Sequence, residues 1–149
     1  MKSSDRERQR LNRMYGYLYN KVNYNKDICY YCNEEASGFD HVPPITSIEY
    51  LNLNEFIKEG NRFLLYPACY ECNKILYDYN EIDVSFRILK IINNIEKKVK
   101  NTTKWTVEEL NELGKNLRNY IVNRQNSNKR LKNKLLRLYR RFKALNGLV

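Results

Sequence analysis

Four cysteines stand in two pairs, and two residues separate the members of each pair. Cys29 and Cys32 form the first pair, and Cys69 and Cys72 form the second. This spacing lets the chain turn so that two thiolates reach one ion, and four thiolates complete a tetrahedral zinc site with no position for water. The sequence therefore predicts one structural zinc ion, and the alternative is four unrelated free thiols.

A single histidine lies between the two pairs, within the run Asp-His-Val-Pro-Pro that begins at Asp40. A neutral imidazole, whose ordinary pKa is about 6.5, can take a proton from water at neutral pH. The alternative for His41 is an ordinary surface or core residue. If this run is a strand, Asp40 and His41 point to opposite faces unless the strand ends or bends at the prolines.

The order of these motifs resembles a known class of enzymes. Cys-x-x-Cys, then Asp-His-Val-Pro-Pro, then Tyr-Pro-Ala-Cys-x-x-Cys-Asn is similar to the HNH, or His-Me finger, endonucleases, over residues 29 to 81. The resemblance implies a β-hairpin and a helix around a catalytic divalent ion. It makes His41 the general base, and Asp40 and Asn73 the ligands of the ion. A carboxylate and a carboxamide are hard oxygen donors, which suit Mg²⁺ or Mn²⁺ better than zinc.

Further positions bear on the resemblance. Many members have an asparagine five residues before the third cysteine, where this chain has Leu64, and Asn61 is a possible substitute from the neighbouring loop. Asp78 and Glu81 are second candidate ligands of the catalytic ion. The alternative is that both are solvated residues of a helix. The sequence alone leaves these alternatives open.

The resemblance implies a metal-dependent DNA endonuclease. In the expected mechanism His41 deprotonates a water that attacks phosphorus, while the ion neutralises the phosphate and the departing 3′ oxygen. One site acting alone would make the protein a nickase, and a homodimer through amphipathic helices would allow double-strand breaks. Two other interpretations are a catalytically silent, zinc-dependent nucleic-acid-binding protein and a protein-binding regulator of nucleic-acid machinery. Small proteins of this type occur in phages, mobile elements and defence systems.

Positive charge is concentrated in the last quarter of the chain. The chain carries 27 Lys and Arg against 17 Asp and Glu, and residues 113–149 contain no acid. Such a tail favours phosphate contact, with double-stranded DNA as the expected partner, over a merely solvated face. The predicted nucleic-acid contacts lie on the final helix: Lys129, Arg130, Lys132, Lys134, Arg137, Arg140, Arg141 and Lys143.

Hydrophobic spacing gives the elements that must position these residues. It predicts helices over residues 5–22, 71–79, 83–98 and 128–145, a further helix that starts near residue 106, and strands at 38–42 and 62–66. Pro67 should end the second strand. In the helix over 83–98 one apolar face is formed by Phe86, Leu89, Ile92 and Ile95.

The predicted fold class is α+β: a small zinc-pinned ββα-metal core flanked by N-terminal and C-terminal helices. Three parts are expected, namely an amphipathic helix (1–27), the nuclease-like core (28–82) and a basic helical region (83–149). No stretch is long and apolar enough to span a membrane, and the N-terminus is charged where a signal peptide would be apolar. We therefore expect a cytoplasmic protein, which could be encoded by a phage and act in a host cell. In that compartment the cysteines would stay reduced and form no disulfides.

Overall fold

The structure, a computed structural model, describes residues 3–100, 108 and 115–147 and has the predicted α+β class. The predicted helix start near residue 106 lies outside the described residues, apart from Glu108. In chain order the elements are α1 (Ser3–Tyr15), η1 (Gly16–Leu18), β1 (Asn20–Lys21), β2 (Gly38–Val42), η2 (Ile45–Tyr50), α2 (Leu53–Lys58), β3 (Leu64–Ala68), α3 (Tyr70–Ile75), α4 (Val84–Lys100) and α6 (Lys115–Leu145).

A three-stranded sheet in the order β1-β3-β2 forms the centre of the molecule. β2 pairs antiparallel with β3, and β1 pairs with β3 in parallel. Since α3 follows β3 after one residue, β2, β3 and α3 have the strand-strand-helix order that was predicted. β2 is an edge strand, so the backbone on its outer side is open to α3 and to ligands.

The N-terminal helix is shorter than the predicted range of 5–22. α1 ends at Tyr15, Gly16 begins a single 3₁₀ turn, and Asn20–Lys21 form β1. A glycine costs a helix interior roughly 1 kcal/mol relative to alanine, and the residues that follow it gain strand partners on β3. Asn20 N, for instance, donates to Phe63 O at 3.0 Å.

The second strand passes through Pro67, so the prediction that this proline ends the strand is wrong. Pro67 O accepts from Tyr30 N at 2.8 Å, on the side of β3 away from β2. The N and the C=O of one strand residue point to the same side, so the missing N–H also faces away from β2. Proline therefore removes no hydrogen bond from the β2–β3 ladder.

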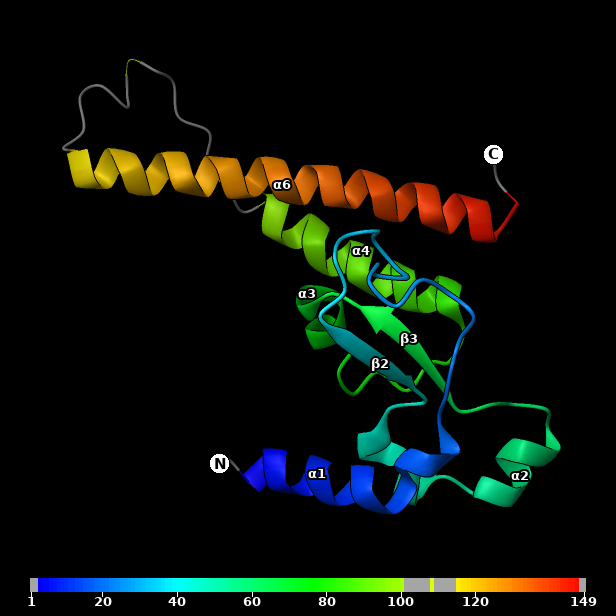
Figure 1. Ribbon diagram of the computed structural model, residues 1–149. Coiled ribbons are helices and arrows are strands. Elements are labelled where there is room, and N and C mark those ends of the chain that lie inside the picture. The colour runs from blue at the N-terminus through cyan, green and yellow to red at the C-terminus, as the bar shows by residue number, and fades with distance from the viewer. Residues whose placement is uncertain (1–2, 101–107, 109–114, 148–149) are drawn as a thin grey trace.

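Helices cover the sheet in layers (Figure 1): α6 lies across α4, α4 lies against one side of the sheet, and α1 lies at the opposite end of the molecule. One buried cluster joins the four cysteines, the sheet, α4 and α6. The predicted apolar face of α4 is correct at Ile92 and Ile95 and wrong at Phe86, which is 54% exposed. Ile88 and Ile91 are buried in its place, because α4 turns that side toward the sheet.

A second, smaller cluster lies under α1 and includes Leu11, Tyr19 and Ile48. The apolar face of the final helix packs inside the chain: Leu138 is buried, and Leu131, Leu135 and Phe142 pack against the first cluster. Homodimer formation stays a prediction. Among the described residues, no helix is long and apolar enough to cross a membrane.

Candidate functional site

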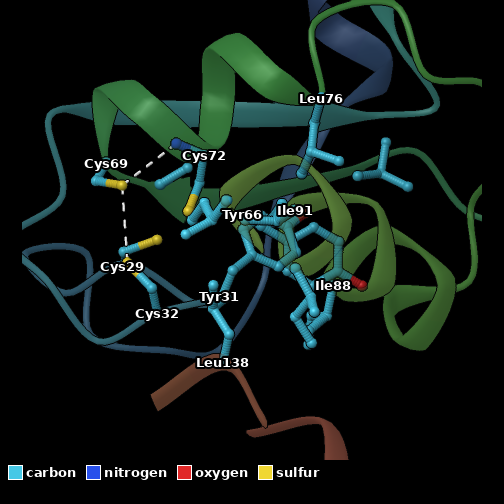
Figure 2. Close-up of a cluster of buried hydrophobic side chains, with 14 residues drawn as sticks. Cys29, Tyr31, Cys32, Tyr66, Cys69, Cys72, Leu76, Ile88, Ile91 and Leu138 are labelled. Atoms are coloured by element: carbon cyan, nitrogen blue, oxygen red, sulfur yellow. Dashed lines mark hydrogen bonds between the residues drawn. The ribbon is translucent and has the colours of Figure 1, made fainter. Parts of the chain in front are cut away.

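The four cysteines meet in one buried cluster, as their spacing predicts. Their sulfur atoms all lie within 4.8 Å of one another, and Figure 2 shows the first pair, on the loop before β2, facing the second pair at the start of α3. Cys32 Sγ and Cys69 Sγ are 3.7 Å apart. Four buried thiols at this separation fit a structural zinc ion. In the part of the chain that the structure describes, this is the only group of three or more His, Cys, Asp or Glu side chains placed to hold one ion.

Local backbone geometry shapes each cysteine pair. In the first pair, Cys29 N donates to Glu34 O at 2.7 Å, and Asn33 takes the left-handed conformation at φ 65°, which asparagine tolerates better than most residues. In the second pair, Cys69 caps α3, and its sulfur accepts from Cys72 N at 3.4 Å. Hydrogen bonds from Cys29 and the other two thiols lower the pKa of Cys69.

A buried lysine from α6 lies against this cluster. Lys134 is 0% exposed, and its Nζ lies 2.9 Å from Glu34 Oε2, 2.9 Å from Glu71 Oε1 and 3.2 Å from Cys69 Sγ. Burial lowers the pKa of Lys134, but the negative charge of Cys72 and hydrogen bonds to both glutamates outweigh it, so the ammonium stays charged. One Zn²⁺ with four thiolates carries a net charge of −2, which this ammonium would partly balance.

Three arginines continue the contact between α6 and the cysteine module. Arg130 bridges Glu34 and Glu71 at 3.2 and 3.4 Å. Arg137 donates to Cys32 O at 2.9 Å, and Arg141 donates to Tyr30 O at 3.1 Å and lies over its ring. At least half of the eight predicted nucleic-acid contacts are therefore engaged within the protein. The exposed members of the set are Lys129, Arg130, Lys132, Arg140 and Lys143.

Asp40 lies on the buried face of β2, 3% exposed. Its Oδ2 accepts from Tyr31 OH at 2.6 Å and from Arg87 Nη2 at 2.7 Å. Arg87, itself 0% exposed, also donates to the carbonyl oxygens of Tyr79 and Glu81 at 2.8 and 2.6 Å. Burial raises the pKa of Asp40, and the charge of Arg87 offsets part of that rise.

Arg87 was not among the residues predicted from the sequence, although its position carried a signal. This arginine falls on the apolar stripe of α4, three residues after Val84 and four before Ile91. A charged residue within such a stripe predicts a buried partner of opposite charge, because an unpaired buried charge is costly.

His41 lies on the other face of β2, because the strand runs unbroken through Val42. Its ring packs edge-on against Tyr19 at 4.7 Å, and the Tyr19 hydroxyl donates to Pro43 O. Burial, with a smaller contribution from the charge of Arg8, lowers the pKa of His41 to about 4. Its Nδ1 is buried and has no hydrogen-bond partner among the described residues.

Asn73, in α3, reaches the open edge of β2, where its Nδ2 donates to Phe39 O at 3.2 Å. Its Oδ1 accepts no hydrogen bond from the described residues. No hydrogen bond to Asp40 Oδ1 is seen among the described residues either, but Asp40 lies on the buried face of β2 and not at the edge where Asn73 lies. The structure thus brings Asn73 to the strand that carries Asp40 and His41, and leaves those two on opposite faces.

The remaining candidates lie elsewhere. α3 ends at Ile75, so Asp78 and Glu81 follow the helix instead of lying on it, and neither joins other described residues in a group that could hold an ion. Leu64 pairs with Val42 in the sheet and packs against the main cluster. Asn61 bonds to Glu59 at 3.5 Å in the preceding loop.

In comparisons with known proteins, no protein-family model matches this chain, and neither the curated proteins nor the solved structures yield a match. Sequence motifs and geometry therefore carry the functional argument.

Proposed function

We propose that the protein is a zinc-stabilised, metal-dependent DNA endonuclease that nicks one strand through His41. The observation that carries this proposal is the state of His41: a neutral imidazole whose ring nitrogen has no partner among the described residues, on an edge strand beside Asn73. A buried nitrogen without a partner costs roughly 1–3 kcal/mol, a cost that a bound water would remove. A water held by a neutral imidazole is the reactant that phosphodiester hydrolysis needs.

In this proposal His41 takes the proton of that water, and the hydroxide attacks phosphorus. Tyr19 fixes the imidazole plane, since its ring lies against one side and its hydroxyl is tied to Pro43 O. Arg8, whose charge reaches His41, attracts the substrate phosphate. The departing 3′ oxygen takes up a proton from solvent, which leaves a 5′-phosphate and a 3′-hydroxyl.

Asp40 Oδ1 and Asn73 Oδ1 would hold the divalent ion, Mg²⁺ or Mn²⁺. Because Asp40 and His41 face opposite sides of β2, the proposal requires the substrate phosphate to lie at the open edge of this strand, where Asn73 lies. When bound, the ion supplies charge neutralisation at the phosphate and at the leaving oxygen. Tyr31 and Arg87 would orient Asp40 for this task, since both donate hydrogen bonds to its other oxygen, Oδ2. Hydrogen bonds of this kind commonly fix the geometry of metal-binding carboxylates.

The second candidate is a catalytically silent, zinc-dependent nucleic-acid-binding protein. The ion pair between Asp40 and Arg87 favours it, because a carboxylate already neutralised by a buried guanidinium attracts a divalent cation less strongly. In this alternative Asp40 serves only to join β2 to α4.

Supercoiled plasmid incubated with the zinc-loaded protein separates the two candidates. Mg²⁺ or Mn²⁺ should convert it to open circles, and His41→Ala, checked for bound zinc, should lose at least about 100-fold of that rate. Arg13→Ala, an exposed substitution on α1, is the control variant and should cleave at the wild-type rate. DNA binding without cleavage by the wild type would favour the silent protein, and a linear product would indicate paired sites.

A further inference from the structure

Three shallow hollows on one side of the molecule join into a single track. The first lies between α1 and α3 and is lined by Arg8, Asn73 and Tyr77 among others. It shares Tyr70 and Lys74 with the second hollow. The second shares Asn94 with the third, which follows α4. The track therefore runs from the candidate catalytic strand, where Asn73 lies, out along α4.

Positive charge dominates this track. Its basic side chains are Arg8, Lys74, Lys90, Lys97 and Lys98, against the acids Asp5 and Glu71. Glu71 is also paired with Lys134 of α6 at 2.9 Å, which compensates its charge from below the surface. A polyanion is therefore the ligand that the track attracts.

Exposed aromatic rings alternate with these cations. Tyr70 is 72% exposed and Phe86 54%. Lys74 lies 5.9 Å from the Tyr70 ring, and Arg8 lies 4.9 Å from that of Tyr77. Flat rings beside cations hold unpaired bases by stacking and their phosphates by charge, whereas a base pair in duplex DNA offers no free face along the helix.

We infer that this track, and not the final helix, is the main nucleic-acid interface, and that it binds an unpaired strand. The inference rests on the proposed function for the direction in which the strand runs, toward His41. Sugar identity is not read by stacking and charge alone, so an unpaired DNA strand and an unpaired RNA strand share this chemistry.

Fluorescence anisotropy tests the inference in the zinc-loaded His41→Ala protein without added Mg²⁺, so that binding is measured apart from cleavage. The probes are labelled oligodeoxythymidine of about 20 nucleotides, the matching duplex, and oligouridine. We expect the single strand to bind at least about 10-fold more tightly than the duplex. If oligouridine binds as tightly as oligodeoxythymidine, the interface does not distinguish ribose from deoxyribose. A preference for one of them would identify RNA or DNA as the natural ligand.

Two double variants locate the interface. Tyr70→Ala with Phe86→Ala should weaken binding by about 10-fold for each base that loses its stacking partner. Lys74→Ala with Lys90→Ala should reduce the salt dependence of log Kd by about 0.7 for each lost phosphate contact. Lys129→Ala with Lys143→Ala, which removes two exposed charges from α6, is the matched control and should bind as the parent protein does.

Failure of each idea has its own signature. The inference would be overturned if the track variants bound as tightly as the parent protein and the α6 control bound weakly. A preference for duplex, or no binding at all, would also overturn it. If the wild-type protein binds the single strand through the track but cleaves neither that strand nor plasmid when Mg²⁺ is added, the proposed endonuclease activity is wrong and the proposed interface is still supported.

Discussion

Neighbouring residues on β2 show how one strand gives two polar groups opposite environments. Asp40 faces the core and receives Tyr31 and Arg87, whereas His41 faces α1 and has a buried nitrogen without a partner among the described residues. Burial disfavours the charged form of both groups. Asp40 has a buried cation to compensate, and His41 has a cation nearby that opposes its protonation further. The two residues are therefore suited to different tasks, one to structure or ion binding and the other to proton transfer.

The titration of His41 is the first prediction at this scale. Because His41 is the only histidine, its Cε1–H resonance is unique, and NMR should give a pKa of about 4. Arg8→Gln should raise that pKa, since one of its two causes is removed, and Arg13→Gln should not. The unfolded chain binds a proton at about pH 6.5 and the folded chain only near 4. Stability should accordingly fall as the pH drops from 6.5 toward 4, and a measured pKa at or above 6.5 would refute the buried neutral imidazole.

The ion pair of Arg87 with Asp40 gives the second prediction. Arg87→Met removes the cation and leaves a buried carboxylate, so the free energy of unfolding should fall by about 3–5 kcal/mol. Urea denaturation measures this change, with exposed Lys97→Met on the same helix as the control, for which a change within about 0.5 kcal/mol is expected. An equally small effect for Arg87→Met would mean that Asp40 is not charged in the folded protein.

Among the elements, α6 depends most visibly on the cysteine module. It contributes Leu138 to the main cluster and places Lys134 between two glutamates and the sulfur of Cys69. Lys134→Met should lower the free energy of unfolding by about 1–3 kcal/mol, because Glu34 and Glu71 lose hydrogen bonds to a buried cation while Arg130 still pairs with both. Zinc should also pass more quickly to a chromogenic chelator. Lys129→Met, exposed on the same helix, is the control, and the same release rate for both variants would show that Lys134 does not stabilise the site.

The ββα order and the cysteine cluster could be predicted because their signals are local. The two-residue spacing within each cysteine pair is enough to predict that both thiols of the pair face one ion. The residues of Gly38–Val42 form the expected strand. Proline was misleading at Pro67, since the sequence does not show on which side of a strand the missing N–H will lie. The end of α1 depended on whether Asn20–Lys21 would find a strand partner 44 residues downstream.

Long-range charge pairing could not be predicted. The basic run of the final helix reads as a solvated or phosphate-binding face, and it gives no sign that Glu34, about 100 residues earlier, will receive Lys134. For the same reason, the ion pair between Arg87 and Asp40 could not be predicted from the sequence. Side chains that pair across the fold depend on packing between elements, and hydrophobic spacing describes each element separately.

For the molecule as a whole, the four cysteines lie where several distant parts of the chain meet. One buried cluster contains Cys29, Tyr31, Ile91 and Leu138, which come from a loop and two distant helices. More cations of α6 than glutamates surround the cysteines, and the negative charge of a zinc-thiolate site would offset that excess. Zinc should therefore stabilise both the loop and the docking of α6.

Removal of zinc is the test at this scale. Structural zinc sites contribute about 10–16 kcal/mol in apparent binding free energy, which equals or exceeds the 5–15 kcal/mol total stability of most domains of this size. A strong chelator at neutral pH should therefore unfold the main cluster, and near-UV circular dichroism should lose the signal of its packed tyrosines. Cys72→Ser should have the same effect without chelator.

Metal add-back distinguishes this structural role from the proposed catalytic one. Zn²⁺ should restore the near-UV signal, whereas Mg²⁺ should not, since thiolates are soft ligands and Mg²⁺ prefers oxygen. Plasmid cleavage should then need both ions, zinc for the fold and Mg²⁺ or Mn²⁺ for the reaction. If the zinc-free protein keeps its near-UV signal and unfolds cooperatively, the hydrophobic contacts of α4 and α6 suffice for the fold, and the cysteine cluster must serve another purpose.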